Sequence, residues 1–144
     1  SINFIIRIKN YSSEDMPFSF GLHPYFKVSN LENTKINGLP PKCINHMSTT
    51  EVDTKYELER LSQGVDFLTT PLNEVTLLDL GEDRKIHLHQ EEPMNLTVVW
   101  TDPPRPMICV EPWTSPREAL ITGERRLLLQ PGAARELYCR FSCD

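Results

Sequence analysis

The chain has 144 residues, 39% of them hydrophobic and 24% charged, and a formal net charge of −5 at pH 7. This length suits one domain with a substantial core, and we expect residues 1–144 to form a single domain. The acidic balance, with basic residues scattered along the chain, argues against nucleic acid as a partner. No apolar run approaches the roughly 18 residues needed to cross a bilayer, so no membrane partner is expected. The sequence leaves the oligomeric state open.

The four cysteines, Cys43, Cys109, Cys139 and Cys143, form no C-x-x-C pair and no regular framework. The last two are closest in sequence, yet in an extended strand they would lie about 13 Å apart, too far for a disulfide. We therefore expect reduced thiols and a cytoplasmic location. The chain does not start with methionine and enters a strand pattern at once, so we expect that it does not begin where its gene does.

Short alternating segments, punctuated by 12 prolines, predict an antiparallel β-sandwich or barrel. The first is a half-buried strand over 2–9, in which apolar residues at even positions alternate with mostly polar ones. Residues 11–17 then predict a polar turn.

Segment 18–23, Phe-Ser-Phe-Gly-Leu-His, predicts a strand with two different faces. Its large side chains point to the core, whereas its small ones share a face with His23, because side chains alternate along a strand. The small residues should leave open space beside the imidazole, as a ligand cleft requires. Pro24 favours an extended backbone at His23, and Tyr25 could line the same cleft.

The rest of the chain predicts further strands and one helix. The helix is expected over 53–61, with Gly64 placed to end it. The strands are expected near 34–38, 43–47, 65–69, 74–79, 84–90, 95–101, 106–111, 125–130 and 135–142. A loop at 102–105 and a turn at Pro131–Gly132 separate the last two pairs.

Glu111 ends an apolar strand. Alternation places its side chain on the face of Met107 and Cys109, opposite Ile108 and Val110. A carboxylate in that position either lies in a cleft or is a solvated charge at a strand end, and the solvated charge is the commoner case.

Asp66 follows Gly64 in a predicted turn. Its carboxylate could face a ligand hydroxyl or accept backbone N–H bonds within the turn, and sequence statistics favour the turn.

His87 and His89 share a strand face and could bind a metal with Glu91. Lys85 on the same face would oppose a cation, so a solvated strand face is favoured and no metal site is expected. The sequence has no phosphate-binding glycine loop and no nucleophile elbow.

Two segments resemble the aldose 1-epimerase (mutarotase) family. Residues 20–26, Phe-Gly-Leu-His-Pro-Tyr-Phe, resemble the segment that carries the family's catalytic acid, and residues 109–113, Cys-Val-Glu-Pro-Trp, resemble the one that carries its catalytic base. Gly64-Val-Asp66 resembles the segment of a substrate-binding aspartate, and 127–132 fits the family's closing segment. The family's upstream half, with a second histidine and an arginine, has no counterpart here. The resemblance therefore implies an all-β fold, an antiparallel β-sandwich of the galactose mutarotase (supersandwich) type, incomplete at its N-terminus.

The resemblance also implies an activity. The protein would interconvert the α and β anomers of a hexose or related sugar, its small-molecule partner, by acid–base ring opening and closure, with no cofactor. His23 would be the acid and Glu111 the base, ionised at neutral pH because glutamate ordinarily loses its proton well below pH 7. Asp66 would bind the sugar, and carboxylates such as Asp66 and Glu111 would favour the charged form of His23. Tyr25 and Trp113 would pack on the sugar or orient the acid.

The alternative is a non-catalytic carbohydrate-binding or scaffolding domain with the same fold. A matched acid and base favour the enzyme, whereas the missing upstream half favours the alternative. For residues 1–144 alone, we expect weak turnover and a tendency to self-associate, because a cut sheet exposes unpaired edges.

Overall fold

The computed structural model describes all residues from 1 to 144, and strands dominate it. The strands are β1 (Ile2–Lys9), β2 (Met16–Phe18), β3 (Tyr25–Lys27), β4 (Thr34–Asn37), β5 (Lys42–Asn45), β6 (Thr50–Asp53), β7 (Asp66–Thr69), β8 (Val75–Asp79), β9 (Arg84–Gln90), β10 (Leu96–Thr101), β11 (Met107–Trp113), β12 (Leu127–Leu129) and β13 (Ala134–Cys143). The helices are α1 (Thr54–Leu58), the 3-10 turn η1 (Leu61–Gln63) and α2 (Ala119–Thr122).

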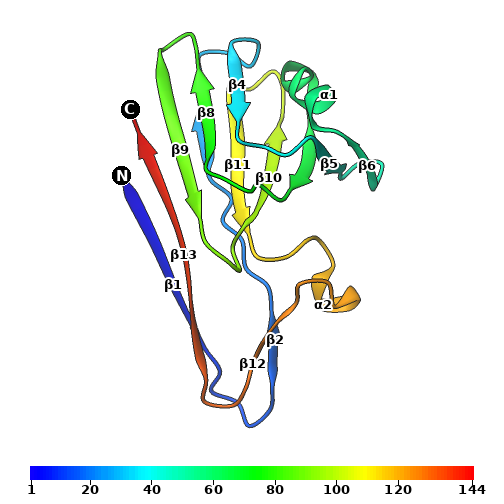
Figure 1. Cartoon of the computed structure of the whole chain (residues 1–144), viewed down its shortest axis with the longest axis vertical. Coiled ribbons are helices and arrows are strands. Elements are labelled where there is room, and N and C mark those ends of the chain that lie inside the picture. The colour runs from blue at the N-terminus through cyan, green and yellow to red at the C-terminus, as the bar shows by residue number, and fades with distance from the viewer.

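The strands form two main layers in which every pair is antiparallel. One sheet has five strands in the order β1-β13-β9-β8-β4, and the other has six in the order β3-β11-β10-β7-β5-β6. Strands β2 and β12 form a separate ribbon that lies below the six-stranded sheet in Figure 1, at the level of the lower ends of β1 and β13. This arrangement confirms the predicted antiparallel β-sandwich.

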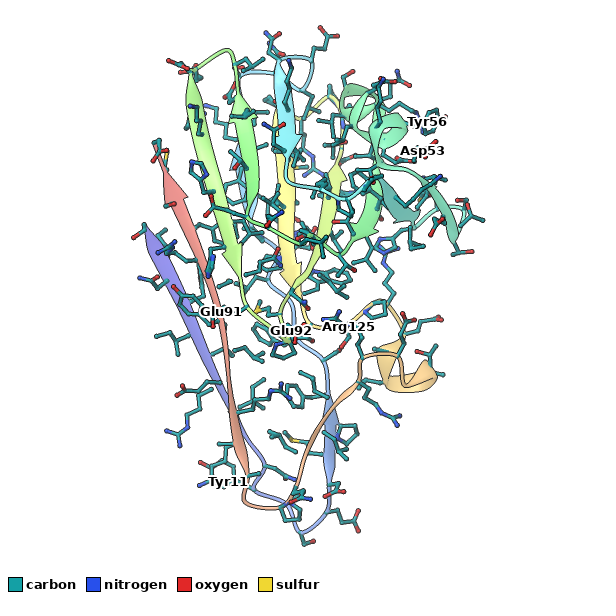
Figure 2. The ribbon with its side chains drawn as sticks, in the orientation of Figure 1. Tyr11, Asp53, Tyr56, Glu91, Glu92 and Arg125 are labelled. Atoms are coloured by element: carbon teal, nitrogen blue, oxygen red, sulfur yellow. The ribbon has the colours of Figure 1, made fainter.

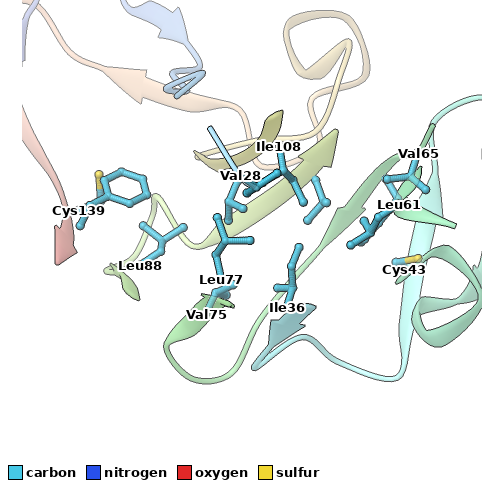
Figure 3. Packing of buried hydrophobic residues seen from close by; sticks show 14 of the residues in the cluster. Val28, Ile36, Cys43, Leu61, Val65, Val75, Leu77, Leu88, Ile108 and Cys139 are labelled. Carbon is cyan, nitrogen blue, oxygen red and sulfur yellow. The ribbon is translucent and has the colours of Figure 1, made fainter. Parts of the chain in front are cut away.

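The core lies between the two sheets. Leu77 and Leu88 enter it from the five-stranded sheet, and Ile108 enters it from β11 of the six-stranded sheet (Figure 3). Val110, also on β11, belongs to the same core. Because side chains alternate along a strand, Glu111 then faces away from this core. The predicted division of β11 into two faces is confirmed. The outer face of the six-stranded sheet, which carries Glu111, takes no part in the core between the sheets.

The predicted strand over 18–23 is wrong. The chain leaves β2 at Phe18, makes a single bridge between Gly21 and Trp113, and resumes as β3 at Tyr25. The N–H of Phe20 donates to the side-chain oxygen of Thr114, so it is not available for the backbone hydrogen bonds that join one strand to the next. The large residues of this segment still pack against the core, as the alternation predicted.

The predicted helix over 53–61 is shorter than expected. Strand β6 takes residue 53, α1 ends at Leu58, and η1 continues the turn to Gln63. Gly64 follows with a φ of 96°, a conformation that favours glycine. The sequence did not predict β2, β3, β6 or α2, and β2 begins within the expected turn over 11–17.

No helix of the structure combines the length and the apolar character needed to cross a membrane. The four cysteines are all free thiols, and only Cys143 is exposed.

Replacement of Leu88 by Ala should lower the free energy of unfolding by about 2–5 kcal/mol, because Leu88 is 1% exposed and its loss opens a cavity in the core. Leu72, at 90% exposure, provides the matched control, and Leu72→Ala should change stability by no more than about 0.5 kcal/mol. Urea unfolding followed by circular dichroism measures both. Equal effects of the two substitutions would contradict the core described here.

Candidate active site

The outer face of the six-stranded sheet gathers the polar and aromatic residues that the sequence singled out. Directly paired residues on neighbouring strands present their side chains to the same face. The register pairs Cys109 of β11 with Tyr25 of β3 and with Trp100 of β10, and it pairs Trp100 with Asp66 of β7. Glu111 shares this face by alternation, so four strands contribute to one surface.

His23 lies next to Glu111. Its Nε2 is 3.4 Å from Oε1 of Glu111, and its side chain is 51% exposed whereas that of Glu111 is 2% exposed. The imidazole stacks on Tyr25 with ring centres 4.9 Å apart and meets the edge of Trp100 at 5.7 Å. The structure thus brings a half-exposed imidazole and a buried carboxylate together, with two aromatic rings fixing the imidazole plane.

Burial changes the acid–base behaviour of Glu111. Burial raises the pKa of this carboxyl group to about 7, although a hydrogen bond from the indole of Trp113 to Oε2, at 3.0 Å, lowers it. The expectation that Glu111 is fully ionised at neutral pH is therefore wrong. Near pH 7 the protonated and ionised forms are both populated.

Gly21 makes room for Trp113. A Cβ atom at Gly21 would lie 2.6 Å from Cδ1 of Trp113, closer than such contacts occur. The small residue therefore seats the indole rather than leaving open space beside the imidazole. Ser19 and Gly21 do line a pocket of about 570 Å³ with Trp113 and Arg117, but His23 is not part of its wall.

The carboxylate of Asp66 is held on both oxygens. His46 Nδ1 lies 2.6 Å from Oδ1, and the guanidinium of Arg117 donates to Oδ2 at 2.8 Å. Burial raises the pKa of Asp66, but the His46 and Arg117 contacts outweigh it, and the pKa lies below its ordinary value. The predicted turn role is wrong for this side chain, and of the two carboxylates expected near His23 only Glu111 contacts it.

Two anchored segments bring these partners of Asp66 into place. Asn45 accepts the N–H groups of residues 47 and 48 and donates to Glu57, which fixes the turn that carries His46. Arg125 donates to the backbone oxygens of Thr114 and Pro93, which ties residues 114–125 to the turn between β9 and β10 (Figure 2).

Sequence reasoning missed His46 and Trp100 and did not link Arg117 to Asp66. Trp100 could have been found, because it alternates with Leu96 and Val98 on a predicted strand. The contact between His46 and Asp66 joins residues 20 apart and has no local sequence signal. Asp66 and Trp100 line a second pocket, of about 410 Å³, with Asn45 and Arg60 among its other residues.

The two histidines of β9 do not converge. His87 pairs with Glu74 at 3.1 Å and with Asp144 at 3.0 Å, whereas His89 lies 3.6 Å from Glu91. Their separate carboxylate partners agree with a polar strand face rather than a shared metal site.

Comparison with known proteins adds the family context. The sequence profile of the aldose 1-epimerase family matches residues 1–142. No curated protein sequence matches the chain.

Several solved structures share the fold. The Slr1438 protein from Synechocystis sp. PCC 6803 is 25% identical, with a TM-score of 0.90 over 98% of this chain and 50% of its own. A galactose mutarotase-like protein from Clostridium acetobutylicum is 16% identical, with a TM-score of 0.76 over 99% of this chain and 52% of its own. One from Lactobacillus casei ATCC 334 is 18% identical, with a TM-score of 0.74 over 99% of this chain and 58% of its own. The chain thus spans about half the length of these structures.

Ionisation of Glu111 should cost folding stability. Its pKa in the folded state, about 7, lies above the ordinary value of 4.5, so stability falls as pH rises between these values and stays reduced above them. Glu111→Gln removes this cost and should stabilise the chain at pH 8 by up to about 3 kcal/mol, with little effect at pH 4. Urea unfolding at both pH values measures this. Glu91→Gln, an exposed control, should change stability by no more than about 0.5 kcal/mol at either pH. An equal effect of Glu111→Gln at pH 4 and pH 8 would contradict the raised pKa.

Proposed function

The chain belongs to the aldose 1-epimerase family, and from this premise we propose that it works as a mutarotase, interconverting the α and β anomers of a hexose or related sugar. The observation that carries the proposal is the pair of His23 and Glu111, whose facing atoms are 3.4 Å apart on the outer face of the six-stranded sheet. The resemblance of both segments to the family's acid and base segments supports the same assignment.

The geometry suits the chemistry of ring opening. A cyclic aldose opens when the C1 hydroxyl loses a proton and the ring oxygen gains one, and both oxygens are attached to C1. An acid and a base that lie side by side can therefore serve both atoms at once. We assign proton removal from the C1 hydroxyl to Oε1 of Glu111 and proton donation to the ring oxygen to Nε2 of His23, with the roles reversed on closure. Each transfer typically contributes about 10²–10⁴-fold.

The pKa of Glu111 is suited to this role. A base whose pKa is close to the working pH combines a useful ionised fraction with a strong affinity for the incoming proton. At about 7, Glu111 meets that condition, whereas an ordinary exposed glutamate would be a weaker base.

Neighbouring side chains would position these groups and the sugar. Tyr25, stacked on His23, orients the acid, whereas the indole of Trp113 orients the base rather than the acid. Asp66, fixed from two sides, keeps lone pairs with which to accept a hydrogen bond from a sugar hydroxyl.

A carbohydrate-binding domain without turnover is the second candidate. The exposed ring of Tyr25, at 58%, beside Trp100 favours it, because aromatic faces provide apolar surface for the C–H face of a sugar. A pure binder would hold sugar equally well after loss of His23 or Glu111.

The proposed location is the cytoplasm. The four free thiols support a reducing compartment.

His23→Ala and Glu111→Gln should each slow mutarotation by at least about 10²-fold, because each removes one proton-transfer group. Polarimetry on freshly dissolved α-glucose and α-galactose, with the protein that contains residues 1–144, measures the rate. His89→Ala is the matched control, since His89 lies outside the site and should leave the rate unchanged. Near-wild-type rates in both site variants would eliminate the mechanism. A wild-type protein without turnover, whose sugar affinity neither substitution changes, would favour the binding domain.

The rate should fall as pH drops through about 7, because protonation of Glu111 removes the base. Trp113→Phe removes a hydrogen bond that lowers this pKa and should move the midpoint of the fall to higher pH. Trp100→Phe alters an aromatic neighbour of His23 that does not bond to Glu111, so the midpoint should stay in place. Rate profiles recorded from about pH 4 to about pH 9 provide the measurement, and a midpoint that Trp113→Phe leaves unmoved would exclude control by Trp113.

A further inference from the structure

Cys109 belongs to the site face but has no part in the proposed mechanism. It is fully buried, and β-strand pairing places it between Tyr25 and Trp100, the two rings that contact His23. Its thiol therefore lies at the base of the same surface on which the imidazole and the Glu111 carboxylate meet.

The three potential ligand atoms lie close enough to share one ion. A nitrogen of His23, the sulfur of Cys109 and a carboxylate oxygen of Glu111 all lie within 4.8 Å of one another, and no other trio in the chain does. Three atoms at most 4.8 Å apart share a point within about 2.8 Å of each, which is 4.8 Å divided by √3. Zinc takes nitrogen and oxygen ligands at about 2.0–2.2 Å and sulfur at about 2.3 Å, so shifts of at most about 0.5–0.8 Å would complete the contacts.

The separation of the histidine and the carboxylate already fits such a site. Two ligands about 2.1 Å from a tetrahedral ion lie about 3.4 Å apart, and Nε2 of His23 lies 3.4 Å from Oε1 of Glu111. The His23 side chain is half-exposed, so an incoming ion can reach the imidazole from solvent.

The donor set selects the class of ion. One nitrogen, one sulfur and one oxygen suit borderline or soft ions such as Zn²⁺ and Cd²⁺, whereas Mg²⁺ and Ca²⁺ take oxygen ligands. Burial raises the pKa of the Cys109 thiol to about 12, so an incoming ion must displace its proton. The one positive charge that acts on this thiol belongs to Arg105, which is paired with Asp102 on its own loop.

We propose that His23, Cys109 and Glu111 together bind a single thiophilic divalent cation. Thiolate ligation releases the proton of Cys109, and the ion occupies the space between the groups to which we assign proton transfer. The bound ion therefore blocks turnover. That consequence rests on the proposed function, whereas cation binding itself does not.

Titration of the protein with Cd²⁺ tests the proposal, because a cadmium–thiolate bond gives an ultraviolet charge-transfer absorption that reports on cysteine ligation directly. Wild-type protein at about pH 8 should develop this absorption to saturation at one ion per chain, and excess Mg²⁺ should not displace it. Cys109→Ser should abolish the absorption. Cys139→Ser should retain it, because Cys139 is a buried thiol with a raised pKa in the core, away from His23 and Glu111.

A second pair of variants keeps the test decisive if Cys109→Ser fails to fold. His23→Ala removes a half-exposed side chain and should weaken Cd²⁺ binding by at least about tenfold. His89→Ala, also exposed, should leave the affinity unchanged. Any of three results would overturn the site. The absorption could persist in Cys109→Ser, it could be lost instead in Cys143→Ser, which removes the exposed thiol, or His23→Ala could leave the midpoint of the Cd²⁺ titration unmoved.

Discussion

The indole N–H of Trp113 donates to one oxygen of the buried Glu111 carboxylate and leaves the other facing His23. Without this donor, burial would raise the pKa of the carboxyl group further and favour its neutral form. The bond also requires that the indole lie close to the backbone of Gly21, where no side chain can be accommodated. One hydrogen bond therefore links the segment that carries His23, the strand that carries Glu111 and the protonation behaviour of that carboxyl group.

The sandwich core holds β11 in place beneath the outer face that carries Cys109 and Glu111. Ile108 and Val110 lock β11 into the core, so the alternate residues Cys109 and Glu111 are held in position on the opposite face. The histidines, in contrast, come from segments outside the strands. His23 lies between a single β-bridge and β3, and His46 lies in a turn fixed by Asn45. Fixed strands thus carry the carboxylates, and anchored turns bring the imidazoles to them.

Much of this arrangement could be predicted from local pattern. Alternation assigned Glu111 and Cys109 to one face of a strand, and it assigned Phe20 and Leu22 to the core even though the strand predicted there does not form. Patterns of this kind depend only on neighbouring residues and on the two-residue period of a strand.

Properties that depend on distant residues were not predictable. The pKa of Glu111 follows from burial by the folded sheet, which a single sequence does not contain, and the sequence alone indicated an ionised base. The partners of Asp66 come from positions 20 residues before it and 51 residues after it. Gly21 was expected to leave open space beside His23, but it accepts an indole from a strand 92 positions away.

The chain has two tryptophans; Trp100 contacts His23, and Trp113 donates a hydrogen bond to Glu111. Indole fluorescence is sensitive to hydrogen bonding and to nearby charge. The indole emission of this protein therefore comes entirely from the vicinity of Glu111 and His23, and it provides a label-free signal of the ionisation of Glu111.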